Sequence, residues 1–182
     1  MMQKIIAIVG MSGTGKSTAA HFLKDKYNFD FFYFGGVILR KMEQQRMLIN
    51  SENEKKAREE LRYSHGKEFL VKFAIEKIAK TNNTIVLDGL YSFTEYKILK
   101  EKYPNNFILL AIHVNKSIRY ERLSQRKIRP LTKEEVDYRD YSEIENIEKG
   151  GPIAIADYHI INNGEMSQFE DAISKLIDEI FQ

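Results

Sequence analysis

The chain has 182 residues, of which 43% are hydrophobic and 30% are charged, which is typical of one soluble globular domain. Its 28 basic and 26 acidic side chains leave a formal net charge of +2, which argues against binding nucleic acid or an anionic membrane through overall charge. Cysteine is absent, so disulfides, thiol catalysis and cysteine-ligated metals are excluded. No apolar run reaches the about 18 residues of a membrane span, and MMQKIIAIVG does not read as a signal peptide. We expect a single cytoplasmic domain over residues 1–182, either a monomer or a homodimer.

Short apolar or aromatic runs alternate with amphipathic segments along the chain. The strands that we expect cover residues 4–9, 30–34, 84–87, 107–114 and 158–161. Several of them are continuously apolar, as strands buried on both faces are. Four capping boxes indicate helix starts, namely Ser51 with Glu54, Ser92 with Glu95, Thr132 with Glu135 and Ser167 with Glu170. Strands separated by helices predict a three-layer α/β fold around a five-stranded parallel sheet.

The segment after the first expected strand reads GMSGTGKST and matches G-x-x-x-x-G-K-[ST] completely. Its glycines let successive backbone N–H groups point into one concavity, and the start of the following helix makes that concavity more positive. Lys16 can reach the β- and γ-phosphates of a nucleotide, and the Ser17 hydroxyl can ligate Mg²⁺. The predicted ATP-binding residues of this loop are Gly10, Ser12, Gly13, Thr14, Gly15, Lys16, Ser17 and Thr18.

Two long segments interrupt the alternation of strands and helices. Residues 36–80 contain two or three expected helices before the next strand, and residues 127–156 are charged and have no strand signal. Excursions of this kind often close over a ligand. We expect the first to bind a phosphoryl acceptor and the second to form a lid.

Charged residues at the ends of two strands indicate the rest of the site. Asp88 ends an apolar run, where its carboxylate can hold Mg²⁺ together with Ser17 or meet the acceptor. Arg119, Arg122 and Arg126 are spaced to share one helical face and lead into residues 127–156. Guanidinium groups suit phosphate contacts, so we interpret this cluster as part of the lid. A solvated basic helix and an RNA-binding face are the alternatives.

Together these motifs resemble the small P-loop nucleotide kinases, in particular the adenylate-kinase-related and dephospho-CoA-kinase-like proteins, over essentially the full length of the chain. The shared features are the P-loop, Asp88-Gly89, Arg122 with Arg126, and the sequence ADYHIIN at residues 156–162. The resemblance implies that Arg122 lies against the adenine and that Arg126 reaches the phosphates. It also implies that Asn162 and Gly164 line the base pocket and that Arg139 is a lid arginine.

The chain departs from this family where the acceptor binds. Relatives tend to carry G-D-x-L-R after the second strand, whereas this chain reads FGGVILR, so that Gly36 and Arg40 keep their spacing and Val37 replaces the acid. Tyr91 stands where relatives usually offer an arginine after Asp-Gly. We predict that the acceptor contacts Gly36, Arg40, Asp88 and Tyr91, and the basic residues Arg58, Arg62 and Lys67 could add charge to the same excursion.

These features predict a kinase that uses ATP and Mg²⁺ to phosphorylate a small nucleotide-like acceptor, either a nucleoside monophosphate or dephospho-CoA. The expected catalytic residues are Lys16, Asp88, Arg126 and Arg139, and the expected metal ligands are Ser17 and Asp88. The alternative is a nucleotide-binding ATPase or switch that acts on a protein or RNA partner. The acceptor-site departures favour this alternative, and the lid arginines oppose it.

Overall fold

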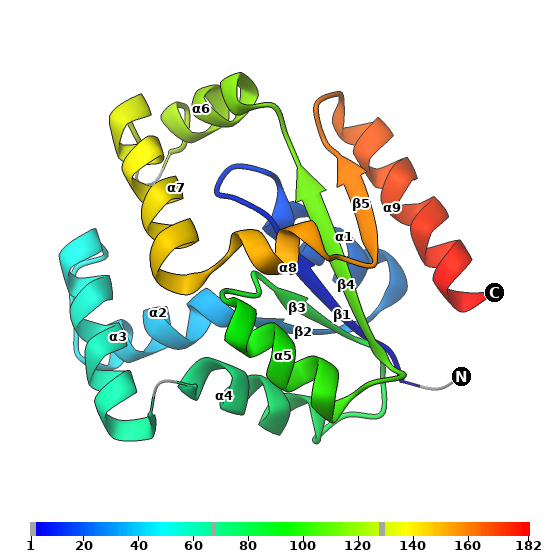
Figure 1. Cartoon of the computed structure of the whole chain (residues 1–182), viewed down its shortest axis with the longest axis horizontal. Helices are drawn as coiled ribbons and strands as arrows, with labels where there is room; N and C mark the ends of the chain where they lie inside the picture. The colour runs from blue at the N-terminus through cyan, green and yellow to red at the C-terminus, as the bar shows by residue number, and fades with distance from the viewer. Residues whose placement is uncertain (1–2, 67, 128–129) are drawn as a thin grey trace.

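The computed structural model of the chain describes residues 3–66, 68–127 and 130–182 and confirms the α/β class (Figure 1). Within these residues, five parallel strands form one sheet in the order β2-β3-β1-β4-β5. The strands are β1 (Ile5–Val9), β2 (Asp30–Tyr33), β3 (Ile85–Asp88), β4 (Phe107–His113) and β5 (Tyr158–Ile161). Each expected strand is present, with ends that differ by one residue at most.

Helices on both faces of the sheet complete three layers. They are α1 (Lys16–Tyr27), α2 (Phe34–Gln44), α3 (Ser51–His65), α4 (Phe69–Ile78), α5 (Phe93–Lys102), α6 (Lys116–Ser124), α7 (Lys133–Ile147), α8 (Gly150–Ala154) and α9 (Met166–Phe181). Figure 1 shows α3, α6 and α7 beyond the carboxyl ends of the strands. No helix in the described part of the chain is both long enough and apolar enough to cross a membrane.

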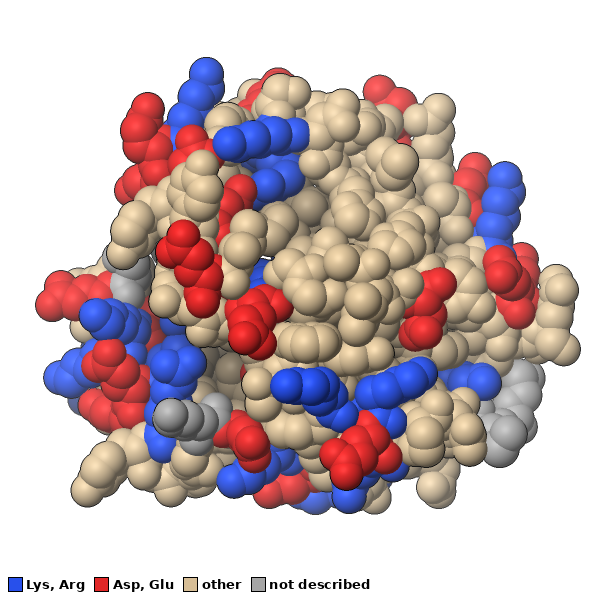
Figure 2. All heavy atoms as spheres, in the orientation of Figure 1, with Lys and Arg blue, Asp and Glu red and all other residues tan. Residues whose placement is uncertain are grey.

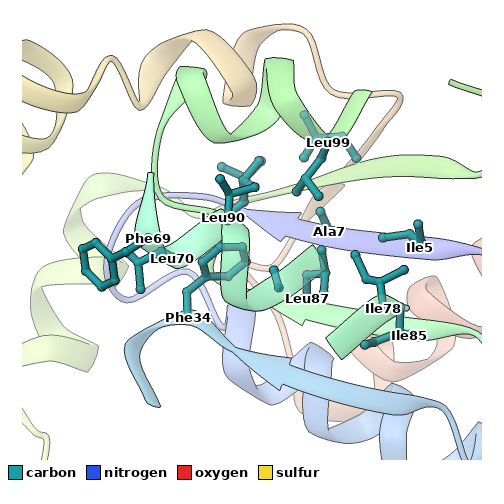
Figure 3. Packing of buried hydrophobic residues seen from close by; sticks show 14 of the residues in the cluster. Ile5, Ala7, Phe34, Phe69, Leu70, Ile78, Ile85, Leu87, Leu90 and Leu99 are labelled. Atoms are coloured by element: carbon teal, nitrogen blue, oxygen red, sulfur yellow. The ribbon is translucent and has the colours of Figure 1, made fainter. Parts of the chain in front are cut away.

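Alternate residues of the strands point to two hydrophobic clusters, one on each face of the sheet. Ile5, Ala7 and Val9 pack with Leu87 and with buried residues of α2, α4 and α5 (Figure 3). Ile6 and Ile8 pack with α1 and α9 on the other face. The buried stripe of α9 consists of Phe169, Ile173, Leu176 and Ile177. Because both faces are covered, the central strands β1, β3 and β4 are apolar along nearly their whole length, and the polar residues at the strand ends are left to form the site.

Two of the four predicted capping boxes are confirmed. Ser92 with Glu95 begins α5, and Thr132 with Glu135 begins α7. The other two are wrong in register. Asn50 caps α3 by accepting a hydrogen bond from the Asn53 amide, and the Ser51 side chain lies outside the described part of the chain. Glu165 with Gln168 begins α9, and the Gln168 side chain accepts a hydrogen bond from the Glu165 amide over 3.2 Å.

Both excursions are helical. The first begins at Phe34, directly after β2, and contains α2, α3 and α4. The second contains α7 and α8, and residues 128–129 within it lie outside the described part of the chain. They meet the carboxyl ends of the strands, the edge at which open α/β sheets bind ligands.

Candidate functional site: a phosphate-binding loop and a cationic cavity

The loop between β1 and α1 is held in a conformation that requires glycine at two close approaches. Gly10 and Gly15 have φ angles of 151° and 96°. A Cβ atom at Gly10 would lie 2.5 Å from the Ile112 carbonyl oxygen, and one at Gly15 would lie 2.6 Å from Asn162 Nδ2. Inside the loop, Lys16 Nζ donates a hydrogen bond to the Met11 carbonyl over 2.9 Å. The loop is therefore tightly wound before any phosphate binds.

Two buried side chains support this loop from outside. Asn162 Nδ2 donates to the Thr14 carbonyl over 3.0 Å. Arg119 Nε donates to the Ser12 carbonyl over 2.7 Å, and its Nη2 binds both carboxylate oxygens of Asp140 on α7. Arg119 thus ties the loop to the second excursion, and Asn162 has a supporting contact that the sequence did not indicate.

The predicted arginine cluster is only partly correct. Arg119 is buried, with 6% of its surface exposed, and so does not lie on an open phosphate-binding face. The helix α6 ends at Ser124, so Arg126 follows the helix instead of continuing its face, whereas Arg122 lies on α6. The three arginines do not share one helical face, because α6 stops two residues before Arg126.

Ser17 and Asp88 lie together at the start of α1 and the end of β3. Asp88 pairs with Ile8 in the sheet register and is 2% exposed. Burial raises the pKa of Asp88, while a hydrogen bond from the Ser17 hydroxyl opposes that shift. Its Oδ1 is buried without a hydrogen-bond partner among the described residues. A buried carboxylate oxygen with unused capacity beside a hydroxyl fits a Mg²⁺ site.

The loop opens into a cavity of about 180 Å³ that both excursions border. Among the described residues, five cationic and two acidic side chains line it, namely Lys16, Arg58, Arg126, Arg139 and Lys149 with Glu54 and Asp88. The other lining residues are Ser12, Gly13, Ser17, Tyr33, Gly35, Ile38, Leu39, Gly89 and Tyr91. On the face shown in Figure 2, by contrast, basic and acidic side chains are interspersed. The lining of the cavity therefore carries an excess of positive charge.

Two of the five lining cations in the described part of the chain lie against the ring of Tyr91. The Arg58 guanidinium lies 5.3 Å from the centroid of the Tyr91 ring, and Lys149 Nζ lies 5.4 Å from it. Both distances suit cation–π contacts. The Tyr91 amide donates to Glu95 Oε2 over 2.8 Å, so the capping box of α5 also fixes the backbone that carries this ring.

A buried acid holds two of the cations. Glu143 on α7 is 5% exposed, and its carboxylate binds Lys149 Nζ over 2.6 Å and Arg139 Nε over 3.0 Å. Burial alone would raise the pKa of Glu143, but the charges of Lys149 and Arg139 outweigh burial and lower it to about 2. Glu143 is therefore ionised and positions both cations.

The neighbouring positive charge also affects the pKa of the P-loop lysine, Lys16. Burial of its ammonium group, together with the neighbouring Lys149 charge, lowers the pKa of Lys16 to about 7. A phosphate beside Lys16 would restore its charged form, because an opposite charge favours ionisation. The site is electrostatically incomplete without an anion.

The structure brings eight of the seventeen predicted site residues to one cavity. Ser12, Gly13, Lys16, Ser17, Asp88, Tyr91, Arg126 and Arg139 all line it. Gly36 and Arg40 instead border two other hollows along α2, and Arg62 borders a third. Thr18 lies on α1, Gly164 lies between β5 and α9, and Lys67 lies outside the described residues.

Sequence reasoning missed Lys149, Glu143 and Glu54, and it treated Arg58 only as added charge. No local motif contains these residues, since Glu143 and Lys149 pair across the end of α7. The one available signal was a basic residue in each charged excursion, which does not distinguish Arg58 from Arg62.

Comparison with solved structures identifies the fold of the chain. The chain superposes on a shikimate kinase from Bacteroides thetaiotaomicron with a TM-score of 0.63 and 16% identity, over 98% of this chain and 99% of that one. It superposes on a gluconokinase from Sinorhizobium meliloti with a TM-score of 0.61 and 14% identity, over 99% and 97% of the two chains. At these identities the likeness establishes the fold, which is that of the P-loop kinases.

Sequence comparison then gives the family. The AAA domain profile matches residues 6–149. A UPF0200 protein of Thermococcus kodakarensis is 32% identical over 182 residues, which cover 97% of each chain. A UPF0200 protein of Sulfurisphaera tokodaii is also 32% identical, over 179 residues and 97% of each chain. The chain therefore belongs to the AAA domain family and to the UPF0200 family.

Proposed function

We propose that the protein transfers the γ-phosphate of ATP to a small nucleotide-like acceptor that itself carries a phosphate, in a reaction that requires Mg²⁺. The observation that carries this proposal is the P-loop that opens directly into a cavity with five cationic and two acidic lining side chains, counted over the described residues. With a neutral acceptor, the cations that do not contact the nucleotide would have no anion to bind. An anionic acceptor would use it for binding and for stabilising the transferred group.

The P-loop end of the cavity would hold the nucleotide. Its amides and Lys16 bind the phosphates, while Ser17 and Asp88 would hold Mg²⁺, which neutralises charge on the β- and γ-phosphate oxygens. Arg126 and Arg139 line the same cavity and neutralise charge on the transferred group. By the family resemblance, Arg122 contacts the adenine, and Asn162 and Gly164 border the base.

Transfer to a phosphate oxygen does not require a general base. An oxygen of the acceptor phosphate forms a new bond to the γ-phosphorus, and the bond from that phosphorus to the β-phosphate oxygen breaks, which releases ADP. The attacking oxygen is already anionic, so no proton has to be removed first. Catalysis then consists of positioning and charge stabilisation, and the lining residues supply both.

A phosphate acceptor fits the cavity better than a hydroxyl acceptor does. A hydroxyl must lose a proton to a base. Of the two lining acids, Asp88 would hold Mg²⁺ together with Ser17, and Glu54 is near the Arg139 charge. We therefore rank a nucleoside monophosphate first and dephospho-CoA, which would react through a ribose hydroxyl, second.

The test is a substrate panel with ATP and Mg²⁺, with products separated by anion-exchange chromatography. The panel contains AMP, GMP, CMP, UMP and dephospho-CoA, with shikimate and gluconate as acceptors that react through a hydroxyl. We expect at least one monophosphate to become a diphosphate, with equal release of ADP. Phosphorylation of a hydroxyl acceptor and of no monophosphate would overturn the ranking. The Lys16→Ala variant, purified in parallel, controls for a contaminating kinase.

A nucleotide-dependent switch is the second candidate, and one contact supports it. Arg119 joins the Ser12 carbonyl to Asp140 of α7, so a change in the loop is transmitted to the second excursion. ATP hydrolysis that proceeds at the same rate with every acceptor, accompanied by nucleotide-dependent hydrogen exchange in α7, would favour this function over acceptor phosphorylation.

A further inference from the structure

The two helical excursions meet through one aromatic ring. Arg58 comes from α3 in the first excursion, and Lys149 precedes α8 in the second. Tyr91 comes from the loop between β3 and α5, and both cations lie within 5.4 Å of its ring centroid. Figure 1 shows how far apart these three segments are along the chain, although they converge beyond the carboxyl ends of the strands.

Of the two cations around Tyr91, Arg58 is not neutralised by a nearby acid in the described part of the chain. Arg58 Nε is buried and has no hydrogen-bond partner among the described residues. Glu143 is shared between Lys149 and Arg139, so one carboxylate serves two cations. The carboxylates of Glu95 and Asp140 also act on Lys149, so Arg58 is the cation of this cluster that forms no ion pair among the described residues. A buried cation without full compensation is costly unless an anion arrives.

A phosphate monoester has the chemistry to complete this cluster. It carries about −1.5 to −2 charges at neutral pH and several strong acceptor oxygens. Arg58 can offer a planar set of donors and Lys149 a point charge, the two ways in which proteins bind phosphate. Both side chains line the cavity into which the P-loop opens.

We infer that Arg58 and Lys149, arranged on the ring of Tyr91, form the binding site for the acceptor's phosphate group. This inference rests on the proposed function and narrows it to acceptors with a phosphate monoester. The position of Tyr91 is the one at which the related kinases usually offer an arginine. In this chain the positive charge comes from two other segments, and the aromatic ring provides the surface that orders them.

Two buried acids act as positioning residues for this site. Glu143 holds Lys149 Nζ over 2.6 Å, and Glu95 holds the Tyr91 amide over 2.8 Å. Neither carboxylate has to touch the acceptor. Glu143 fixes the lysine and Glu95 fixes the backbone that carries the ring, so that the cation is in position before the phosphate binds.

The test measures binding, so it does not depend on turnover. The full chain is saturated with Mg²⁺ and a non-hydrolysable ATP analogue, and AMP is titrated into it by calorimetry, with inorganic phosphate as a smaller probe. The site variants are Arg58→Met and Lys149→Met. We expect each to weaken the binding of AMP and of inorganic phosphate on the order of 10- to 100-fold, as loss of a charge-assisted hydrogen bond does. Affinity for the ATP analogue should change less than about 2-fold.

Matched controls lie close to each variant. Arg62→Met removes the same functional group one turn further along α3, where the side chain does not line the P-loop cavity but borders an adjoining hollow that Arg58 and Tyr91 also line. Lys97→Met removes an exposed lysine that lies 5.0 Å from the Phe93 ring, a similar cation–π contact outside the cavity. Both should bind AMP and inorganic phosphate as the wild type does. Arg58→Lys and Lys149→Arg, which keep the charge, should recover part of the lost affinity.

Each outcome decides the inference. It is overturned if neither probe binds the wild type, or if Arg58→Met binds both probes as tightly as Arg62→Met does. Arg58 makes no ion pair within the described residues, so this variant should fold even if Lys149→Met does not. Probe binding that depends on Arg58, without any phosphoryl transfer, would support the site and refute the proposed function.

Discussion

The two ends of the cavity are built in different ways. The nucleotide end is one continuous segment from Gly10 to Ser17 between a strand and a helix, and most of its binding groups are backbone amides. The acceptor end is assembled from side chains of three separate segments, which meet only in the folded chain. Few amino-acid sequences can therefore form the nucleotide end. The acceptor end can be made by many combinations of residues, so a missing motif does not imply a missing site.

The two ends also differ in how their charge is held. Lys16 is supported by a carbonyl of its own loop, whereas Lys149 is supported by a buried carboxylate of another helix. Substitutions at the nucleotide end should thus change function with little effect on stability. At the acceptor end, function and folding should be coupled through Glu143.

The largest expected effect is at the nucleotide end. Lys16→Ala should lower the rate of phosphoryl transfer by about 10³-fold or more, because this lysine acts on the phosphates in the transition state. Chemical unfolding of the variant without nucleotide should show no loss of stability, since a desolvated ammonium group has been removed. Calorimetry gives the accompanying change in ATP affinity. Equal turnover in wild type and variant would refute the role of the loop.

The next effect tests the coupling at the acceptor end. Glu143→Gln should lower the free energy of unfolding by about 3–5 kcal/mol, because Lys149 would remain buried without its carboxylate. The double variant Glu143→Leu with Lys149→Met should recover much of this loss while acceptor binding stays weak. Urea denaturation followed by circular dichroism measures the free energy of unfolding of both variants. If the double variant is no more stable than Glu143→Gln, the buried pair is not the source of the loss.

Arg119 links the P-loop to α7, and its removal should affect both of these segments moderately. Arg119→Leu removes the contacts with the Ser12 carbonyl and Asp140, so we expect ATP affinity to fall about 10-fold. Amide hydrogen exchange should become faster along α7 in the variant without nucleotide. In the wild type, ATP should slow exchange in residues 130–147. Exchange in α7 that is insensitive both to the substitution and to ATP would show that the bridge does not couple the excursion to the loop.

The same difference between the ends explains what could be predicted from the sequence. The strands, the α/β class and the P-loop follow from local patterns, because buried parallel strands are apolar throughout and a phosphate cradle needs glycine at fixed spacing. Asp88 was predicted because it ends such a strand. The partnership of Glu143 with Lys149 could not be predicted, since it depends on where α7 ends and α8 begins. Arg126 was expected on one helical face and lies beyond it because α6 ends at Ser124.

The pH dependence of stability should report on Lys16. Its pKa is about 7 in the folded chain, against an ordinary value of 10.5. Between these values the unfolded chain holds a proton that the folded chain does not, so the free energy of unfolding should rise with pH from about 7 upward. The rise should not exceed about 1.4 kcal/mol per pH unit, the value for a full one-proton difference between the two states. Below pH 7 both states are protonated and this contribution is constant.

Lys16→Met isolates this contribution, because other titrating groups remain in both proteins. Urea unfolding at pH 7, 8 and 9 without nucleotide should show a steeper rise for the wild type than for the variant. With the ATP analogue bound, the phosphates keep Lys16 charged and the two curves should become parallel. Parallel curves already in the absence of nucleotide would mean that the lysine is charged and solvated in the free protein.

The smallest expected effect is at Arg40, which the sequence motif predicts as an acceptor contact but which the structure places outside the cavity. Arg40 keeps the spacing of the acceptor motif, and the sequence predicts that it binds the acceptor phosphate. In the structure its exposed side chain borders hollows along α2 and does not line the cavity of the P-loop. We therefore expect Arg40→Ala to change the acceptor's KM by less than about 3-fold, while Arg58→Met raises it at least about 10-fold, with the KM for ATP unchanged in both. The reverse order would show that α2 moves Arg40 into the cavity when the acceptor binds, and that the motif spacing predicts the site better than the free structure does.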